Sequence, residues 1–92
     1  MEEIVDKQRL KGKVAIVTGG GKGIGRAIVL GYAKEGVNLV VGGRTTSYLE
    51  EVCREAQSLG ASTLPVKVDV SVEHEVERLV GDALKVFGKV DI

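Results

Sequence analysis

The stretch TGGGKGIG, residues 18–25, holds five glycines in eight residues and could do chemistry with its backbone alone. A diphosphate needs N–H groups that point at it with no Cβ in the way. Gly19, Gly21, Gly23 and Gly25 make that approach sterically possible. An isolated glycine cluster can equally be a plain turn. The flanking elements decide between the two, because a phosphate-binding loop follows a strand and opens a helix.

The residues on both sides of the loop have the pattern that phosphate binding requires. KVAIVT at 13–18 is rich in β-branched residues and ends abruptly in glycine, which is typical of a buried strand. A helix is predicted over 23–35 and is closed by Gly36. Its apolar positions, which recur at helical spacing, are Ile24, Ala27, Ile28 and Gly31.

Strands and helices continue to alternate along the rest of the chain. NLVVG at 38–42 and STLPVKV at 62–68 have strand length, and VDI at 90–92 begins a fourth strand. Pro65 cannot donate a ladder hydrogen bond and suggests an edge strand. Short connections between alternating elements predict an α/β fold with a parallel sheet, in one domain over 1–92. Such sheets bring ligands to the carboxyl ends of their strands, where the glycine loop lies.

The second and third helices have marked starts and apolar stripes. Ser47 is predicted to cap the second helix in a capping box with Glu50, and Gly60 ends it. Ser71 is predicted to cap the third helix, which Gly88 closes. The inward stripes are Leu49, Val52, Cys53 and Ala56 on the second helix, and Val76, Leu79, Val80, Ala83 and Phe87 on the third.

Composition excludes several classes of protein. Thirteen basic and thirteen acidic residues cancel without a basic stripe, so nucleic acid and anionic membranes are not expected partners. The apolar runs are too short to span a membrane and the start is too polar for a signal peptide, so we expect a cytoplasmic protein.

Cys53 is the single cysteine and is predicted to be a core residue, and His74 is predicted to lie on a solvated helix face. No metal site is predicted.

The loop departs from the common G-x-G-x-x-G spacing. Thr18-Gly19, three residues, then Gly23-Ile24-Gly25 resembles the T-G-x-x-x-G-x-G loop of the short-chain dehydrogenase/reductase family. A nucleoside-triphosphatase loop is disfavoured because glycine follows Lys22. LKGKVAIVTGG, Asp69-Val70 and FGKVDI extend the resemblance over nearly all 92 residues. It implies a Rossmann-like, doubly wound parallel sheet cut off at the start of its fourth strand, similar to 3-oxoacyl-ACP reductases and sugar dehydrogenases.

The end of the second strand bears on the cofactor. In dinucleotide folds an acid there holds the 2′-hydroxyl of NAD, whereas an arginine suits the 2′-phosphate of NADP. Here the strand ends in Gly42-Gly43-Arg44, and Thr45 and Thr46 add hydroxyls. Lys22 resembles the basic residue of NADP-preferring family members. We therefore expect NADP(H) rather than NAD(H), although Arg44 and Lys22 could also be ordinary solvated charges.

Asp69 and Val70 follow the third strand. The resemblance implies that this acid accepts a hydrogen bond from the adenine amino group and that the next backbone group assists. Asp69 could instead form a turn or help to cap the third helix. The expected cofactor-binding residues are Gly19, Gly21, Lys22, Gly23, Ile24, Gly25, Arg44, Thr45, Asp69 and Val70.

The resemblance also implies what this chain lacks. Family members transfer hydride with a tyrosine followed four residues later by a lysine, but Tyr32 precedes Gly36 and Tyr48 precedes Val52 at that spacing. We expect the N-terminal, cofactor-binding part of an NADP(H)-dependent oxidoreductase, with no catalytic residue and inactive alone. A complete enzyme would act on a small carbonyl or alcohol substrate and form a homo-oligomer. A non-catalytic nucleotide-binding module and a decayed fragment remain alternatives.

Overall fold

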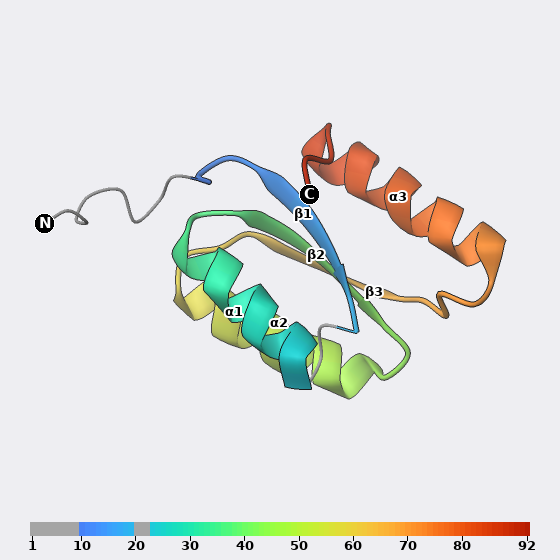
Figure 1. Cartoon of the computed structure of the whole chain (residues 1–92), viewed down its shortest axis with the longest axis horizontal. Helices are drawn as coiled ribbons and strands as arrows, with labels where there is room; N and C mark the ends of the chain where they lie inside the picture. Colours follow the sequence, from blue (N-terminus) through green and yellow to red (C-terminus); the bar gives the residue numbers. More distant parts are fainter. Residues whose placement is uncertain (1–9, 20–22) are drawn as a thin grey trace, which may run out of the picture.

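Strands and helices alternate in the computed structural model, which describes residues 10–19 and 23–92. Figure 1 shows the three strands and three helices of this part of the chain. The elements are β1 (Val14–Thr18), α1 (Gly23–Lys34), β2 (Asn38–Gly43), α2 (Thr46–Ser58), β3 (Thr63–Lys67) and α3 (Glu73–Phe87). The predicted order of elements is confirmed, and each boundary lies within about two residues of its predicted position.

The three strands form a parallel sheet in the order β1-β2-β3. Thr18 pairs with Gly42, and Gly43 pairs with Lys67, so the strands end at one edge of the sheet. Pro65 lies on β3, which is an edge strand in the described part of the sheet, as predicted. The parallel arrangement gathers the segments that follow the strands, including the glycine loop.

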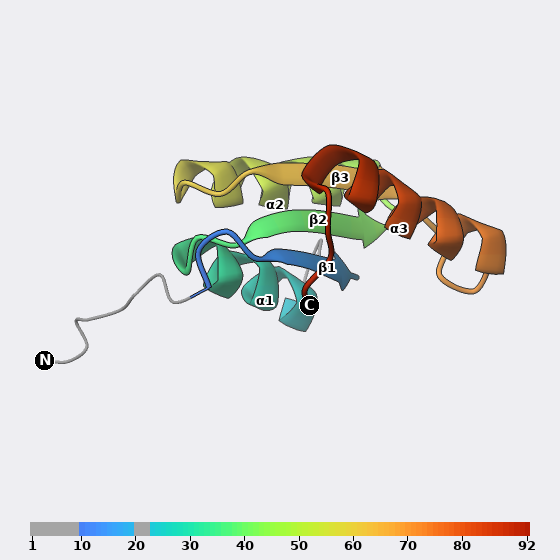
Figure 2. The same cartoon turned by 90° about the horizontal axis from the view of Figure 1, so that it is seen from above.

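Two helical layers cover the sheet. Helices α1 and α2 lie together on one face and α3 lies alone on the other (Figures 1 and 2). Alternate side chains of the strands point to opposite faces. Ala15, Val17, Leu39 and Val41 pack with apolar residues of α1 and α2. Val40, Val66 and Val68 pack with Leu79 and Ala83 of α3.

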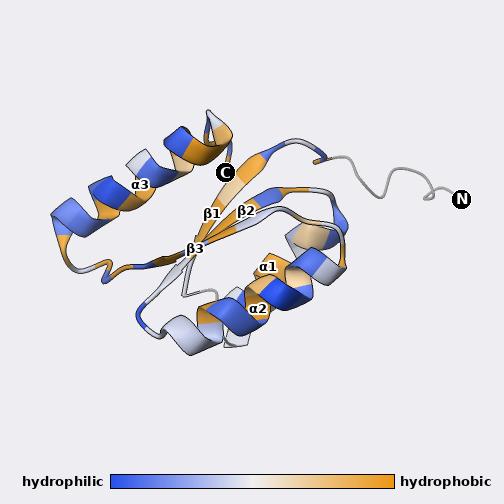
Figure 3. Ribbon diagram, turned by 180° about the vertical axis from the view of Figure 1, so that it is seen from behind, coloured by the Kyte–Doolittle hydropathy of each residue, from blue (hydrophilic) through white to orange (hydrophobic). Residues whose placement is uncertain are grey.

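The central strand β2 is buried on both faces. Leu39, Val40, Val41 and Gly42 are all buried, and Figure 3 shows the concentration of apolar residues in the strands. A strand that pairs on both edges and is covered on both faces needs such a continuous apolar run. The predicted parallel sheet is confirmed, and β1, which was predicted to be a buried strand, has Val14, Ala15 and Val17 buried.

The stripe of α2 is buried as predicted, with Leu49, Val52, Cys53 and Ala56 all in the core. Burial raises the pKa of the Cys53 thiol, with a partly opposing hydrogen bond from Thr63. The thiol therefore stays protonated near neutral pH and packs as a small apolar group. His74 is exposed on α3, as predicted.

The predicted apolar stripe of α1 does not face the sheet. Val29 and Ala33 are the buried residues of the helix, whereas Ile24 is 81% exposed and Ile28 is 44% exposed. Both apolar sets have helical spacing, so periodicity could not choose between them. Val80 of α3, which was also expected to face inward, is 39% exposed because Leu79 and Ala83 make the contact with the sheet.

The predicted caps are wrong for both later helices. The N-cap of α2 is Thr45, so Ser47 lies within the first turn and cannot start a capping box. The N-cap of α3 is Val72 rather than Ser71. In both cases the extended backbone needed at an N-cap falls at a residue whose side chain makes no capping hydrogen bond to the described residues.

Residues 90–92 were predicted to begin a fourth strand; the structure has no strand there, although Asp91 and Ile92 lie beside β1. The N–H groups of Asp91 and Ile92 donate to the Val14 carbonyl at 2.8 and 3.0 Å. The Asp91 carboxylate accepts the Val14 N–H at 2.9 Å, and Lys89 Nζ lies 3.2 Å from it. This carboxylate therefore completes the hydrogen bonding of the first residue of β1.

Gly42 allows α3 to approach β2 closely. A Cβ at this position would lie 2.9 Å from Cγ1 of Val68 and 3.5 Å from Cδ2 of Leu79. Both neighbours are buried, so neither side chain can move aside into solvent. The glycine is required here by packing rather than by backbone conformation.

Replacing Gly42 by alanine should lower the free energy of unfolding by about 1 to 3 kcal/mol, because the added methyl overpacks the layer beneath α3. Gly31→Ala is the matched control, since an added Cβ there meets nothing within 4 Å. Alanine is the better helix former by about 1 kcal/mol, so the control should be neutral or stabilising. Urea denaturation of both variants measures the difference, and an unchanged stability of Gly42→Ala would contradict this packing.

The Asp91 carboxylate should make the free energy of unfolding depend on pH in the acidic range. The hydrogen bond from Val14, assisted by Lys89, lowers its pKa below the ordinary value of 3.8. The ionised form therefore stabilises the fold above that pH, and the contribution is lost as the pH falls through the lowered pKa. Urea midpoints measured from about pH 5 to pH 2 should fall less steeply in Asp91→Asn than in the wild type. Asp82→Asn removes the same charge away from β1 and is the control; equal slopes for wild type and Asp91→Asn would contradict the assignment.

Candidate functional site

A cavity of about 440 Å³ opens at the carboxyl edge of the sheet. It is formed where the three strands end, so residues distant in the sequence meet there. Four predicted cofactor-binding residues line it, namely Gly19, Arg44, Asp69 and Val70. The other lining residues are Thr18, Gly43, Val68 and Ser71, which had been assigned only to strand ends, to the loop motif or to a cap.

The glycine loop begins and ends at residues with positive φ. Gly19 has φ +68° and Gly23 has φ +64°, a region that other L residues adopt at a cost. An added Cβ would meet nothing within 4 Å at either position, so conformation rather than space requires glycine. The Gly19 N–H donates to the Gly42 carbonyl at 2.8 Å and fixes where the chain leaves β1. Gly21 and Lys22 lie outside the described residues.

The residues after the loop start α1 rather than line the cavity. Gly23, Ile24 and Gly25 form its first turn, and Ile24 is largely exposed. The first turn of this helix contains no acidic side chain. The positive end of its dipole is therefore not neutralised by a carboxylate of that turn, which favours the binding of an anion at this helix start.

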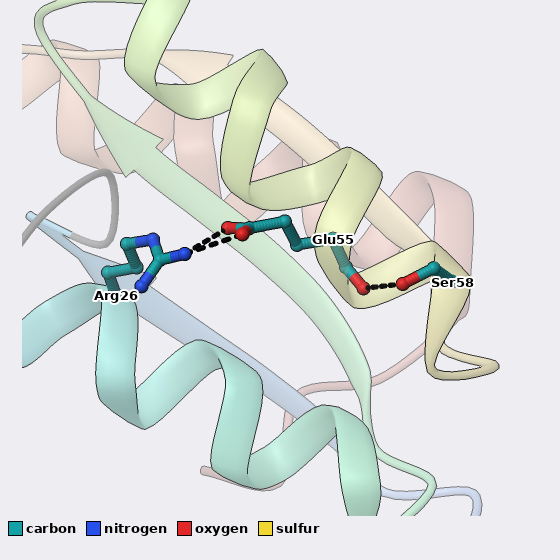
Figure 4. Close-up of polar contacts among 3 residues, drawn as sticks. All are labelled: Arg26, Glu55 and Ser58. Atoms are coloured by element: carbon teal, nitrogen blue, oxygen red, sulfur yellow. Dashed lines mark hydrogen bonds and ion pairs between the residues drawn. The ribbon is translucent and has the colours of Figure 1, made fainter.

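Arg26 links the first turn of α1 to α2. Its Nη2 atom lies 2.6 and 2.5 Å from the two carboxylate oxygens of Glu55 (Figure 4). The Ser58 hydroxyl donates to the Glu55 carbonyl at 2.6 Å. Both charged side chains are about 40% exposed, so the pair contributes at most about 1 kcal/mol. Because Glu55 balances the charge of Arg26, this arginine adds little net positive charge beside the loop.

Arg44 and Thr45 follow β2. Arg44 is exposed and lines the cavity, whereas Thr45 does not belong to the lining. Thr45 is the N-cap of α2 with φ −109° and ψ 105°. Its side chain makes no capping hydrogen bond within the part of the chain that the structure describes. The arginine thus lies beside the start of a second helix whose first N–H groups are not satisfied by a cap.

Asp69 forms a turn with Ser71, as one of the two interpretations of this residue predicts, and the turn is compatible with a role in cofactor binding. Its Oδ1 accepts the Ser71 hydroxyl at 2.7 Å and the Ser71 N–H at 3.0 Å. These two hydrogen bonds, together with the charge of Arg44, lower the pKa of Asp69, so it is ionised at neutral pH. The described residues place no donor on Oδ2. The turn therefore orients the carboxylate and leaves one oxygen for a further donor.

Two side chains that sequence reasoning missed hold this segment from α3. Glu75 Oε1 accepts the Asp69 N–H at 2.8 Å. Arg78 Nη2 donates to the Lys67 carbonyl at 2.9 Å. Glu75 is the third residue of the helix, a position from which an acid often reaches back to preceding N–H groups. This contact was not predicted from the sequence because the helix was expected to start one residue earlier, with Ser71 as the cap.

The described residues contain no cluster of side chains that could hold a metal ion. None of the helices over 10–19 and 23–92 has the length and apolar character to cross a membrane. The cavity is thus built from backbone groups, one arginine, one carboxylate and small side chains. This set of groups can bind a phosphorylated ligand.

Comparisons with known proteins agree with this geometry. L-rhamnose 1-dehydrogenase (NADP(+)) of Thermoplasma acidophilum is 45% identical over 83 residues, which are 89% of this chain and 33% of that protein. A crystal structure of a hydroxysteroid dehydrogenase from Escherichia coli superposes with a TM-score of 0.88 and 37% identity, covering 95% of this chain and 36% of the other. A short-chain dehydrogenase/reductase from Burkholderia phymatum in complex with NAD has a TM-score of 0.84 and 38% identity, covering 87% and 28%.

The chain spans about a third of the length of the curated relatives that it matches. The family model described as short chain dehydrogenase matches residues 13–92, from the start of β1 to the last residue of the sequence. Fold, loop spacing and relatives agree over this whole range. The chain therefore belongs to the short-chain dehydrogenase family.

Proposed function

We propose that this chain is the NADP(H)-binding part of an oxidoreductase that transfers hydride between the cofactor and a carbonyl or alcohol substrate. The observation that carries the preference for NADP(H) is the end of β2. Arg44 lines the cavity there, and Gly43 stands where a carboxylate would be needed to favour NAD. A guanidinium offers several donors in one plane to a phosphate.

The other residues of the cavity would bind the rest of the cofactor. The backbone from Gly19 to the start of α1 would hold the diphosphate, because a helix start offers N–H donors to an anion and the first turn of α1 contains no acidic residue. Asp69 would accept a hydrogen bond from the adenine amino group through Oδ2, which has no donor among the described residues, and the Val70 backbone would assist. The bound nicotinamide would donate or accept the hydride, and this chain would hold the cofactor in position.

Relatives do not decide which cofactor this chain uses. The printed name of the Thermoplasma relative includes NADP(+), whereas the Burkholderia structure is a complex with NAD. The preference must therefore follow from the residues at the end of β2. We also propose that the complete enzyme is cytoplasmic and forms a homo-oligomer. Only the membership of the chain in this family supports these two points.

Arg44→Ala should weaken NADPH binding about tenfold and leave NADH binding nearly unchanged, because hydrogen bonds to a charged group contribute roughly 1.5 to 3 kcal/mol. Isothermal titration calorimetry of the 92-residue chain with each cofactor measures both constants. Arg54→Ala, which removes an exposed arginine of α2 outside the cavity, is the control. Equal affinity of the wild type for NADPH and NADH, or equal losses in Arg44→Ala, would sink the proposed preference.

Gly43→Asp should reverse the preference, because a carboxylate at this point would accept the 2′-hydroxyl of NADH and repel the 2′-phosphate of NADPH. Gly43→Asn has nearly the same size without the charge and should not reverse it. The added Cβ would lie 3.1 Å from Cδ2 of the buried Leu49, so we expect both substitutions at this position to lower the stability of the fold to a similar extent. The same titrations test both variants, and an identical effect of Asp and Asn would show that size rather than charge is responsible.

A further inference from the structure

The segment that leaves β3 is held at both of its ends by side chains of α3. Arg78 donates to the Lys67 carbonyl and Glu75 accepts the Asp69 N–H. Between them, the Val68 N–H donates to the Gly43 carbonyl of β2 at 2.8 Å, and the Val68 side chain is buried. Three consecutive residues are thus fixed by three separate partners just before the chain enters the cavity lining.

Two further polar groups of Asp69, its carbonyl and its Oδ1 atom, are fixed as well. Its carbonyl accepts the Val72 N–H at 3.0 Å, and its Oδ1 accepts both donors of Ser71. The N–H bonded to Glu75 is the Asp69 backbone donor. Without Glu75, that N–H would have to bond to water instead. The peptide group that precedes Asp69 could then rotate, and the direction of the Asp69 side chain would change with it.

We propose that Glu75 is a positioning residue for the nucleobase pocket: by fixing the Asp69 peptide from α3, it aims the Asp69 carboxylate at the exocyclic amino group of adenine. Arg78 supports the same segment from one turn further along the helix. This inference rests on the proposed function, because it assigns a residue to the adenine end of the same cofactor site.

The geometry requires an acceptor of a particular length rather than a charge. The Glu75 oxygen reaches from the first turn of α3 back to residue 69, six residues earlier. Glutamine keeps the length and an acceptor oxygen, whereas aspartate keeps the charge but is one methylene shorter. A role in positioning therefore predicts that Glu75→Gln preserves function and that Glu75→Asp does not, the opposite of what a charge effect predicts.

The test compares NADPH with its hypoxanthine analogue, in which a carbonyl oxygen replaces the adenine amino group. If Asp69 accepts a hydrogen bond from that amino group, the wild-type chain should bind NADPH about tenfold more tightly than the analogue. Glu75→Ala and Glu75→Asp should each reduce this ratio roughly three- to tenfold, and Glu75→Gln should retain it. Glu77→Ala, an exposed glutamate of the same helix, is the control and should retain the ratio.

The ratio of the two affinities distinguishes a loss of positioning from a loss of folding. A less stable fold would weaken the binding of NADPH and of its analogue equally and would leave the ratio unchanged. A ratio preserved in Glu75→Ala or in Glu75→Asp, or lost in Glu75→Gln, overturns the inference. If Glu75→Ala does not fold, Glu75→Asp and Glu75→Gln decide the question. Failure of the inference differs from failure of the proposed function: in the first case the wild type binds NADPH and Arg44→Ala weakens it, and in the second the wild type binds neither cofactor.

Discussion

The burial of β2 on both faces and both edges is the constraint on which the rest of the structure depends. This strand pairs with β1 and β3, faces α1 and α2 on one side and faces α3 on the other. A buried strand must have all its N–H and C=O groups paired, which fixes the register of its neighbours. The register in turn brings the strand ends to one edge, and the cavity opens there. Stability and binding geometry therefore share one cause.

The two faces of the sheet are covered unequally, and this affects the site. Two helices contact the first face, whereas the second depends on α3 through Leu79 and Ala83. Because α3 also supplies Glu75 and Arg78, the helix that closes the smaller core holds the segment bearing Asp69. Its acidic first turn further favours the helix start electrostatically. A loss of packing at Leu79 would therefore also loosen the segment that bears Asp69 at the edge of the cavity.

Patterns that extend over many residues could be predicted from the sequence, and details set by single hydrogen bonds could not. The alternation of elements, the buried stripe of α2 and the edge position of Pro65 follow from periodicity and from the chemistry of proline. The face of α1 could not be chosen, because its apolar residues outnumber those that one face can bury. The caps at Thr45 and Val72 were missed because backbone conformation, not a capping side chain, sets those starts.

In the candidate site, too, some residues could be predicted from the sequence and others could not. Gly19, Arg44, Asp69 and Val70 could be found because motifs place them at strand ends, and the structure brings them to one cavity. The contact between Glu75 and Asp69 depends on where α3 begins and on the path of six residues between them. No spacing rule encodes that path.

Gly42, Gly43 and Arg44 differ in what a side chain contacts at each position. A Cβ at 42 would lie 2.9 Å from Val68 and one at 43 would lie 3.1 Å from Leu49, both of them buried, whereas Arg44 is exposed. A substitution at 44 therefore changes the lining of the cavity without crowding the core, whereas one at 42 or 43 must displace a buried side chain. In protein-engineering terms, position 44 is where the chemistry of the cavity can be varied independently of the packing between the sheet and its helices.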